Sequence, residues 1–574
     1  MKKLLIYLKE YKKETILGPL FKLLEASFEL MVPLVIASMI DRGIVMGDKQ
    51  HIINMCLVLI LLCFVGFGSA VTAQFFAAKA AAGFAKKVKR ALFDNIQKLS
   101  YADIDRVGTS AMITRMTSDI NQVQQGVNLT IRLLLRSPFV VFGAMVMAFT
   151  INVRQSLIFL VTIILLFLVV GLIMKWSIPR YGQIQSGLDG LLSLTRENHT
   201  GVRVIRAFSL EQREKANFSD KNNSLKDLQV FVGSITALMN PVTYAILNLA
   251  VAFLIYRGAI LVDAGDLTQG QVVALYNYMA QILVELIKFA NLILTVTRAI
   301  ASGNRVEEML ELKSSMEDGT VTSFVPSDCH IEFNNVSMRY QGDTEDSLEG
   351  LDIKIKRGEK IGVIGGTGSG KSTLINLIPR FYDVREGSVV IDGRNVKEYR
   401  LDALRERIGI VPQKAVLFKG TIRDNIRWGK EDATDEEIYD ALTIAQAKEI
   451  VDGKEKGLDE AVSQGGKNFS GGQKQRLTIA RALVRKPEIL ILDDSASALD
   501  FLTDKKLRGA IASMDNPPTT FIVSQRASSV LGCDRIIVLD DGKVVGIGSS
   551  DELLIKCPTY REIYDSQYKK EGAV

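Results

Sequence analysis

The clearest chemical signal in the sequence is a glycine-rich run that ends in lysine and serine. Gly365, Gly366, Thr367, Gly368, Ser369, Gly370, Lys371 and Ser372 spell G-x-x-x-x-G-K-S, between an apolar strand at 361–365 and an apolar helix that starts with Thr373. Glycines let backbone N–H groups point inward around a phosphate, and the helix start adds positive potential. The run therefore predicts a nucleotide site in which Lys371 neutralises phosphate oxygens and Ser372 holds Mg²⁺.

Two aspartates follow a second apolar strand at 489–492. Asp493 is placed to meet the metal ion beside the phosphate loop, directly or through water, and Asp494 comes next in the chain. The pattern is weak alone, because many buried parallel strands end in aspartate. Its order and distance relative to the glycine-rich run make it a strong indication of a nucleoside triphosphate site.

A third motif lies between the other two. Ser470, Gly471, Gly472 and Gln473 follow Phe469 at the predicted start of a helix. A serine hydroxyl and free N–H groups at such a start can bind an anion.

Composition excludes several classes of protein. The chain has 574 residues, of which 48% are hydrophobic and 23% charged, with a mean hydropathy of +0.17. So much apolar content excludes a largely disordered chain. Five cysteines are too few, and odd in number, for a disulfide scaffold, and they lack metal-site spacing. We expect reduced thiols at Cys56, Cys63, Cys329, Cys533 and Cys557.

Charge divides the chain into two halves. Residues 1–320 carry 33 basic against 24 acidic residues, a net charge of +9, and residues 321–574 carry 37 against 40, a net charge of −3. The basic half is also the apolar half. This combination favours a membrane domain with basic cytoplasmic loops over a nucleic-acid-binding protein, so we expect membrane lipids and no nucleic acid as partners.

The apolar half predicts six membrane-spanning helices, since a helix of about 20 apolar residues spans the bilayer core. A large soluble helical bundle is the alternative, but 156–170 has no polar face for water to wet. The expected spans lie near 16–40, 52–78, 131–152, 156–176, 237–261 and 272–296.

Orientation follows from the basic residues. Lysines and arginines are dense before the first span, after the second and after the fourth, whereas the connections after spans one, three and five are short. We therefore expect the amino terminus, the carboxyl half and the long connections 79–130 and 175–236 in the cytoplasm. Those connections are too long for plain loops, so helical extensions of the spans are expected, with turns near 103–110 and 208–218.

Two spans contain acidic residues. Glu25 and Glu29 share a face of the first, where Lys22 can pair with Glu25, and Glu285 lies three residues before Lys288 in the sixth. One interpretation is self-paired charges near the cytoplasmic ends. The other is a polar substrate cavity formed by Glu25, Glu29 and Glu285, because membrane charges are expensive and face a protein interior or water.

Together these motifs resemble the ATP-binding cassette (ABC) transporters, of the exporter type with fused membrane and ATPase domains. The resemblance covers essentially the whole chain and implies three further roles. Tyr340 matches the aromatic residue that stacks on adenine, Gln413 matches the glutamine at the ATP and Mg²⁺ site that faces the membrane domain, and Ser497–Asp500 matches a loop at the dimer interface.

The resemblance implies a domain order and an assembly. We expect an all-α membrane domain at 1–310 with long cytoplasmic helical extensions, a linker at 311–328, and an α/β cassette at 329–574. Two cassettes would enclose two ATP molecules, each between the glycine-rich loop of one chain and Ser470–Gln473 of the other. The chain is then half of a transporter and needs a second half.

The sequence departs from the family pattern at two catalytic positions. The family usually places a glutamate after the magnesium aspartate as general base, and here that residue is Asp494. It also places a histidine on a later strand end, where this chain has Gln525. None of its three histidines, His51, His199 and His330, follows position 330, so no other alignment restores the residue. The resemblance then implies a heterodimeric exporter in which this subunit carries the degenerate ATP site.

Three functional hypotheses remain. The first is an exporter subunit in the cell membrane that moves drugs, lipids or peptides out of the cytoplasm and relies mainly on hydrolysis at its partner's site. The second is a slow homodimeric exporter that tolerates Asp494 and Gln525. The third is an ATP-gated regulatory membrane subunit, which the intact Ser470–Gln473 motif disfavours.

Overall fold

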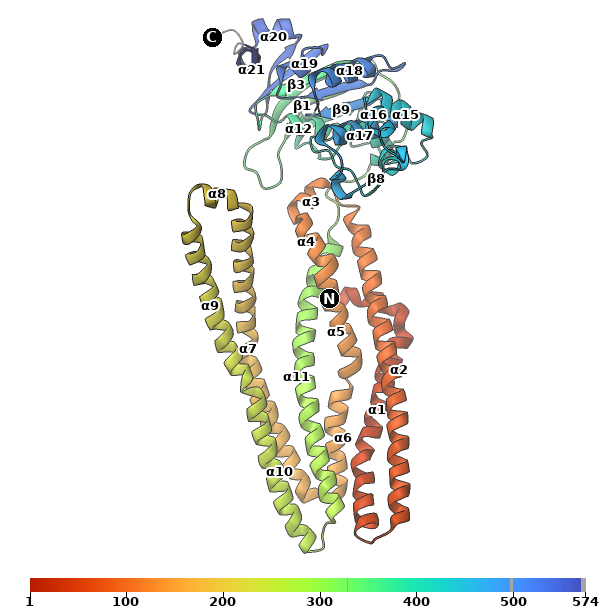
Figure 1. Ribbon diagram of the computed structural model, residues 1–574, viewed down its shortest axis with the longest axis vertical. Helices are drawn as coiled ribbons and strands as arrows, with labels where there is room; N and C mark the ends of the chain where they lie inside the picture. The colour runs from red at the N-terminus through yellow and green to blue at the C-terminus, as the bar shows by residue number, and fades with distance from the viewer. Residues whose placement is uncertain (328, 496–498, 569–574) are drawn as a thin grey trace. The chain divides into compact units, whose positions relative to one another are not determined.

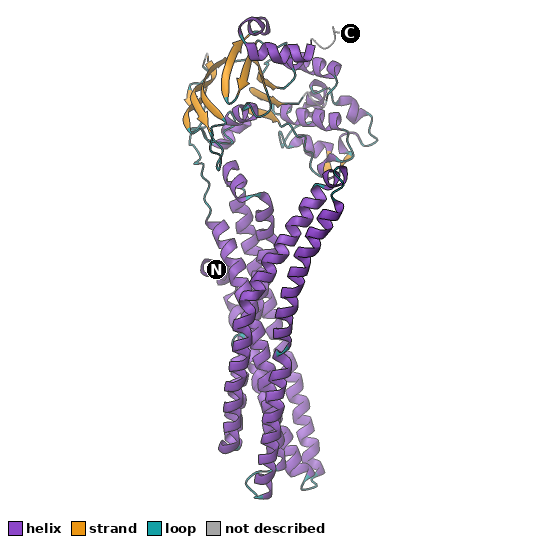
Figure 2. Ribbon diagram, turned by 90° about the vertical axis from the view of Figure 1, so that its left-hand side faces the viewer, coloured by secondary structure: helices purple, strands orange, loops and turns teal. Residues whose placement is uncertain are grey.

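The chain folds into two compact units, seen in the computed structural model (Figure 1), which describes residues 1–327, 329–495 and 499–568. One unit holds Met1–Gln97 and Ser110–Leu312, and the other holds Lys98–Thr109 and Lys313–Val574. Figure 2 shows that the strands of the sheets lie in only one of them. Of the expected features, Asp328 in the linker and residues 497 and 498 in the interface loop lie outside the described residues.

The first unit is helical and contains six helices long and apolar enough to cross a membrane. This confirms the predicted all-α membrane domain of six spans. The helices run over Lys3–Ile44, Lys49–Ile96, Thr109–Ile151, Val153–Thr200, Glu211–Asp263 and Gln269–Glu311.

The spans continue well beyond a bilayer, as expected from the long connections. Helices α2 (Lys49–Ile96) and α7 (Val153–Thr200) each have 48 residues. At about 1.5 Å per residue each is about 70 Å long, more than twice the thickness of the hydrocarbon core. Shorter helices complete the unit: α1 (Lys12–Ser38), α4 (Thr109–Thr114), α5 (Ile120–Leu133), α6 (Arg136–Ile151), α8 (Val202–Ala207), α9 (Glu211–Ala237), α10 (Met239–Asp263) and α11 (Gln269–Glu311).

Tight turns join the helices at the end remote from these extensions. Asp48 caps α2 by accepting a hydrogen bond from the His51 N–H at 3.0 Å, and Asn152 and Thr268 cap α7 and α11 in the same way. Asp41 accepts a hydrogen bond from the Gly270 N–H at 2.8 Å. A Cβ at Gly270 would lie 2.3 Å from the Ala37 carbonyl oxygen, so only glycine allows α1 and α11 to approach this closely.

The second unit is built on a six-stranded sheet of order β12-β11-β3-β10-β9-β6. Its strands are parallel except β12, which pairs antiparallel with β11. They are nearly continuous apolar runs, as expected for strands buried on both faces. The strands are β3 (Lys360–Gly365), β6 (Ile408–Val411), β9 (Ile489–Asp493), β10 (Thr519–Val523), β11 (Arg535–Asp540) and β12 (Lys543–Gly548).

A smaller antiparallel sheet of order β2-β1-β4-β5 packs against the main one around a shared core that includes Phe333, Leu374 and Phe521. Its strands are β1 (Cys329–Met338), β2 (Leu348–Lys356), β4 (Glu386–Ile391) and β5 (Arg394–Asn395), and a two-stranded sheet joins β7 (Gly420–Thr421) to β8 (Ala461–Val462). This confirms the predicted α/β cassette.

Helices surround these sheets. Those that position the site are α12 (Lys371–Leu377), which follows β3, and α17 (Gly471–Leu483), which precedes β9. The others are α13 (Leu401–Glu406), α14 (Ile422–Arg427), α15 (Asp435–Ile444), α16 (Lys448–Asp452), α18 (Phe501–Ala512), α19 (Ala527–Val530), α20 (Ser550–Lys556) and α21 (Pro558–Tyr568).

Helix α3 (Tyr101–Val107) belongs to the sheet-containing unit although it follows α2 in the chain. Ser100 caps it, and Gly108, with φ +79°, ends it. The Asp103 carboxylate accepts a hydrogen bond from the Ser315 N–H at 2.8 Å. Burial opposes ionisation of Asp103, but the hydrogen bonds from Ser100 and Ser315 outweigh it and lower the pKa of the carboxyl below its ordinary value.

Candidate functional site

The glycine-rich loop joins the carboxyl end of β3 to the start of α12. Gly370 has φ +92°, and a Cβ there would lie 2.7 Å from the Ser347 carbonyl oxygen. A residue with a side chain would therefore be strained and would clash. Glycine at this position keeps the backbone N–H groups free to surround a phosphate, as the sequence predicts.

Lys371 lies across the loop. Its Nζ donates hydrogen bonds to the Gly365 carbonyl oxygen at 3.1 Å and to the Ser369 hydroxyl at 3.3 Å. Burial lowers the pKa of Lys371, and the negative charges of Asp493 and Asp494 oppose this effect. An ammonium group held by neutral oxygens in a half-buried cavity can transfer these bonds to phosphate oxygens, where charge makes them stronger.

Ser372 and Asp493 meet because β9 is separated from β3 only by β10. The Ser372 hydroxyl donates to the Asp493 carboxylate at 3.3 Å. Burial, and next the charge of Asp494, raises the pKa of Asp493, while the hydrogen bond from Ser372 opposes that rise. A cation between these oxygen donors would relieve the cost of the buried charge, and oxygen ligands are those that Mg²⁺ prefers. The donors therefore fit the predicted ion.

The two unusual positions face the same cavity. Asp494 has φ +45°, and its N–H donates to the Val523 carbonyl oxygen at 3.0 Å. The Gln413 amide donates to the Asp494 carboxylate at 3.5 Å. The cavity has a volume of about 360 Å³, and its walls include Tyr340, Thr367, Gly368, Gly370, Lys371, Ser372, Thr373, Gln413, Asp493, Asp494, Ser524 and Gln525. The structure thus brings together residues that are up to 185 positions apart, from Tyr340 to Gln525.

Tyr340 lies at the edge of the cavity. Its hydroxyl is 3.1 Å from the Thr373 hydroxyl, and its ring meets the Tyr382 ring edge-on, with centroids 5.1 Å apart. Both contacts hold the ring beside the phosphate loop. Stacking of this ring on adenine remains a prediction.

Ser470–Gln473 does not line this cavity within the chain. Ser470 caps α17, and the Gln473 side chain closes a capping box by accepting from the Ser470 N–H at 3.0 Å. Ser470 and Gly471 are exposed. The motif is therefore rigid and presented to the outside, as contact with the glycine-rich loop of another chain would require, and that contact remains a prediction.

An aromatic cluster beside the site was missed in the sequence. Tyr101 of α3 lies over Phe381, with ring centroids 4.6 Å apart, and the Tyr382 hydroxyl donates to the Asp105 carboxylate at 2.7 Å. Burial and, second, the bond to Asp105 raise the pKa of Tyr382 above its ordinary range. The run Phe381-Tyr382, which begins four residues after α12, was the only signal for this cluster in the sequence.

The charges predicted in the spans gather around one arginine that the sequence analysis overlooked. Arg136, at the start of α6, forms ion pairs with Glu285 of α11 and with Glu29 of α1, the latter at 2.6 Å. The available signal was a pair of arginines, Arg132 and Arg136, at the start of the apolar segment 131–152. Arg136 thereby links three helices of the membrane unit.

The three candidate cavity residues differ in accessibility. The side chains of Glu25, Glu29 and Glu285 are 18%, 41% and 3% exposed. Glu25 also pairs with Lys22, and Glu285 pairs with Lys288 at 2.8 Å, as the self-paired interpretation expects. Glu285 accepts a further hydrogen bond from Ser137 at 2.9 Å. Only Glu29 therefore combines a carboxylate with substantial exposure.

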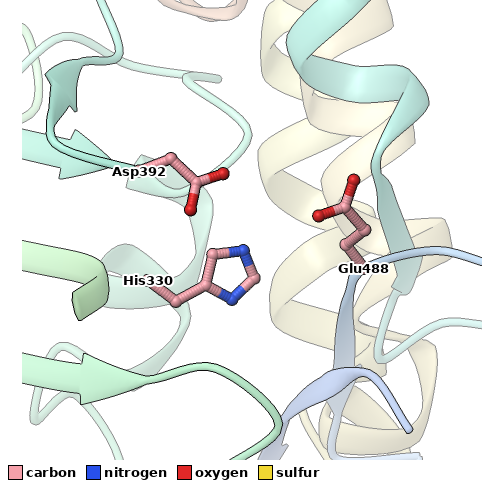
Figure 3. A group of neighbouring side chains, drawn as sticks. All are labelled: His330, Asp392 and Glu488. Atoms are coloured by element: carbon pink, nitrogen blue, oxygen red, sulfur yellow. The ribbon is translucent and has the colours of Figure 1, made fainter. Parts of the chain in front are cut away.

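Another charged group lies at the opposite end of the main sheet, where β9 begins. Asp392, Glu488 and the buried His330 approach one another there (Figure 3). Arg357 and Arg407 already pair with both carboxylates, for example Arg407 with Asp392 at 2.7 Å. Two guanidinium groups neutralise the two carboxylates, so a metal ion would add unpaired positive charge. We interpret the group as an ionic clamp that ties β9 to the β4–β5 turn.

Comparison with known proteins places the chain in a family. The family model of the ABC transporter transmembrane region matches residues 15–286, and the family model described as ABC transporter matches residues 348–497. The chain is 37% identical over 574 residues to the ABC transporter ATP-binding protein YfiB of Bacillus subtilis, covering 100% of both chains.

Other relatives carry more specific names. The chain is 32% identical over 582 residues to YgaD of Bacillus subtilis, a putative multidrug export ATP-binding/permease protein, covering 99% of this chain and 98% of that one. It is 33% identical over 485 residues to the ATP-dependent lipid A-core flippase of Desulfotalea psychrophila, covering 83% of each.

The fold also matches a solved structure along the whole chain. A bacterial Atm1-family ABC exporter with ATP bound superposes with a TM-score of 0.80 at 23% identity, covering 98% of this chain and 99% of the other. The chain is therefore a multi-pass membrane protein with the fold of an exporter. The chain belongs to the ABC transporter family, with the membrane and ATP-binding domains fused in one polypeptide.

Proposed function

We propose that this chain is one half of a heterodimeric ABC exporter, and that it carries the ATP site with little turnover. Hydrolysis in this account occurs mainly at the site that the partner's glycine-rich loop forms with Ser470–Gln473 of this chain. The observation that carries the proposal is the joint replacement of two catalytic groups, by Asp494 and Gln525, around one cavity.

The geometry of Asp494 supports slow chemistry. Asp494 already contacts the Gln413 amide at 3.5 Å and is one methylene shorter than the glutamate usual at this position. A general base must lie within about 3 Å of the proton that it removes. A shorter side chain on a backbone fixed by the bond to Val523 is poorly placed to reach an attacking water.

The binding machinery, by contrast, is complete. Lys371 and the glycine-rich loop would hold the phosphates, while Ser372, Asp493 and Gln413 would hold Mg²⁺, which neutralises phosphate charge when bound. Binding without rapid turnover suits a site whose ATP stabilises the dimer in which the two cassettes enclose the nucleotides. We also propose that the amino terminus and the cassette lie in the cytoplasm, because basic residues are dense before the first span and after the second and fourth.

Amphipathic compounds are the substrate class that we propose. The names of the relatives support lipid or drug export, and Glu29 offers one exposed carboxylate for a cationic group. Peptides remain within this class. Arg136 neutralises much of the acidic charge, so selection for cations should be modest.

Purification with and without the partner tests the proposal. The chain is expressed with an affinity tag, the co-purifying half-transporter is identified, and ATPase activity is compared between the single chain and the pair. We expect a different half with glutamate after its magnesium aspartate and a later histidine, and activity mainly in the pair. Robust turnover by a homodimer would favour the slow homodimeric exporter and refute the proposal. ATPase activity of the pair with no transport into vesicles would favour the regulatory subunit.

A further inference from the structure

A groove in the membrane unit lies between α7 and α10, close to the short turns where α7 begins and α10 ends. It has a volume of about 750 Å³. The two helices run side by side there (Figure 1). Both ends of the groove belong to the same compact unit, so its shape does not depend on the other unit.

The walls of the groove are almost wholly apolar. They carry aliphatic and aromatic side chains at helical spacing on each side: Leu157, Ile158, Val161 and Leu165 from α7, and Ile246, Leu249, Phe253 and Leu261 from α10. Several of them are exposed, Leu249 by 72% and Val161 by 65%. A surface of this kind suits an acyl chain.

Two arginines line the same groove. Arg154 lies at the second position of α7, and Arg257 lies six residues before the end of α10, about 9 Å along the helix axis. Both are exposed, and among the described residues no carboxylate forms an ion pair with either. Charges in a membrane segment are expensive unless they meet a counter-charge or water. Because both arginines lie near the ends of their helices at the short turns, we expect them at the level of the lipid headgroups.

A buried acceptor adds a second signal. Gln155 also lines the groove but is only 2% exposed. Its Oε1 is buried and has no hydrogen-bond partner in the part of the chain that the structure describes. Such an acceptor is costly and is usually satisfied by water or a ligand. A hydroxyl donor from a bound molecule would satisfy it.

We propose that this groove binds an anionic phospholipid whose headgroup carries hydroxyl groups, such as phosphatidylglycerol. The phosphate contacts the guanidinium groups of Arg154 and Arg257, a headgroup hydroxyl donates to Gln155, and one acyl chain follows the apolar walls. Guanidinium groups match phosphate in charge and geometry. The site is independent of the proposed heterodimer and of the degenerate ATP site.

A tryptophan reporter in the groove tests this proposal. Trp176 and Trp428, the two tryptophans of the chain, are replaced by phenylalanine, and Phe253→Trp is introduced. The full-length chain, in the dimer that it forms, is reconstituted with brominated phosphatidylglycerol or brominated phosphatidylcholine, which quench tryptophan on contact. We expect phosphatidylglycerol to be preferred about tenfold at this reporter, a size that two basic residues supply for an anionic lipid.

Matched variants separate the groove from ordinary lipid contact. Arg154→Ala/Arg257→Ala should abolish the preference while quenching by phosphatidylcholine persists, which also shows that the reporter position is folded. Arg42→Ala removes an exposed arginine of the α1–α2 connection that forms no ion pair with any described residue, and it should leave the preference intact. Brominated phosphatidylglycerol should also quench more than brominated phosphatidic acid, which lacks the glycerol hydroxyls, and Gln155→Leu should remove that difference.

Three outcomes would overturn the proposal. Equal quenching by both lipids would show general lipid contact, and a preference that survives Arg154→Ala/Arg257→Ala would place its origin elsewhere. Quenching by neither lipid would mean that helices of the second half-transporter fill the groove. A Phe64→Trp reporter on α2, where the native ring is 71% exposed, provides the reference for a surface without selectivity.

Discussion

At the scale of single residues, the ATP cavity separates binding groups from catalytic groups. Lys371, Ser372 and Asp493 line the cavity and match the family pattern expected for phosphate and Mg²⁺ binding, whereas Asp494 and Gln525 line it but differ from that pattern. The glycine-rich loop and the aspartate pair were predictable because each motif consists of contiguous residues. The role of Arg136 was not predictable. Its partners Glu25, Glu29 and Glu285 lie on two helices, α1 and α11, that are far apart in the sequence.

Replacement of the loop lysine should weaken nucleotide binding. Lys371→Ala removes a charged donor to phosphate, and we expect ATP affinity at this chain's site to fall by roughly tenfold or more, since such bonds contribute about 1.5–3 kcal/mol. Binding of a fluorescent ATP analogue measures the change. Lys414→Ala, an exposed lysine near Gln413, is the control. Unchanged affinity in Lys371→Ala would show that this loop does not bind the nucleotide.

Two glutamates of the membrane unit should behave differently. Glu285→Gln leaves the buried Arg136 with fewer counter-charges, so we expect a loss on the order of 2 kcal/mol in the stability of the unit, moderated because Glu29 remains. Glu29→Gln should cost little stability and should lower efflux of cationic dyes more than neutral ones. Thermal unfolding and dye efflux measure the two effects. Equal losses of stability, or equal effects on both kinds of dye, would contradict this division of roles.

At the scale of elements, the order of strands was harder to predict than their existence. Each apolar run could be recognised in the sequence, but the arrangement β3-β10-β9 that places Asp493 and Gln525 beside the loop is a property of long-range pairing. Helix α3 shows the same limit. Sequence placed a turn near 103–110 but gave no reason for Tyr101 and Asp105 to pack on Phe381 and Tyr382.

The Tyr382 hydroxyl makes one of the contacts that hold α3 against the cassette. Tyr382→Phe deletes the hydrogen bond to Asp105, and we expect amide hydrogen exchange in α3 to accelerate about fivefold, equivalent to about 1 kcal/mol. ATP affinity should not change, because the ring contact with Tyr340 remains. Tyr564→Phe, in α21, serves as the control. Unaltered exchange in α3 would mean that the aromatic contacts alone hold the helix.

The ionic clamp predicts acid sensitivity of the cassette. Burial, and next the positive charge of Arg357, lowers the pKa of His330 to about 4. In the unfolded chain His330 therefore binds a proton near pH 6.5, whereas in the folded cassette it stays neutral down to about pH 4. The stability of the cassette falls as the pH drops from about 6.5 toward 4. The pKa of Glu488 is lowered to about 2, chiefly by its hydrogen bond with Arg407, so its contribution is lost only between about pH 4.5 and 2.

A glutamine variant isolates the histidine. Between pH 7 and 4.5, the melting temperature of the cassette should fall by about 5 °C more in the native chain than in His330→Gln. Fluorescence of Trp428, which lies in the cassette, can follow unfolding. His199→Gln, an exposed position, should keep the native slope. If the melting temperature of His330→Gln depends on pH as strongly as that of the native chain, the acid sensitivity comes from other groups.

At the scale of the whole molecule, the proposed function requires the chain to contribute complementary halves to two different ATP sites. Its own cavity is lined by the loop with Asp494 and Gln525, whereas Ser470–Gln473 does not line that cavity and has Ser470 and Gly471 exposed. Membership of the family and the six spans could be predicted from the sequence, because contiguous motifs and the lengths of apolar segments can be recognised without a structure. The identity of the substrate could not, since it depends on how side chains of several helices, such as Glu29 and Arg136, meet in space.

The most direct test of the degenerate site is ATPase activity of the assembled transporter carrying Asp494→Ala. If this site contributes little turnover, the variant should keep at least about half of the native rate, whereas glutamine in place of the partner's glutamate should abolish it. Loss of activity by tenfold or more in Asp494→Ala, with ATP binding and assembly intact, would show that Asp494 is a working general base and would contradict the account.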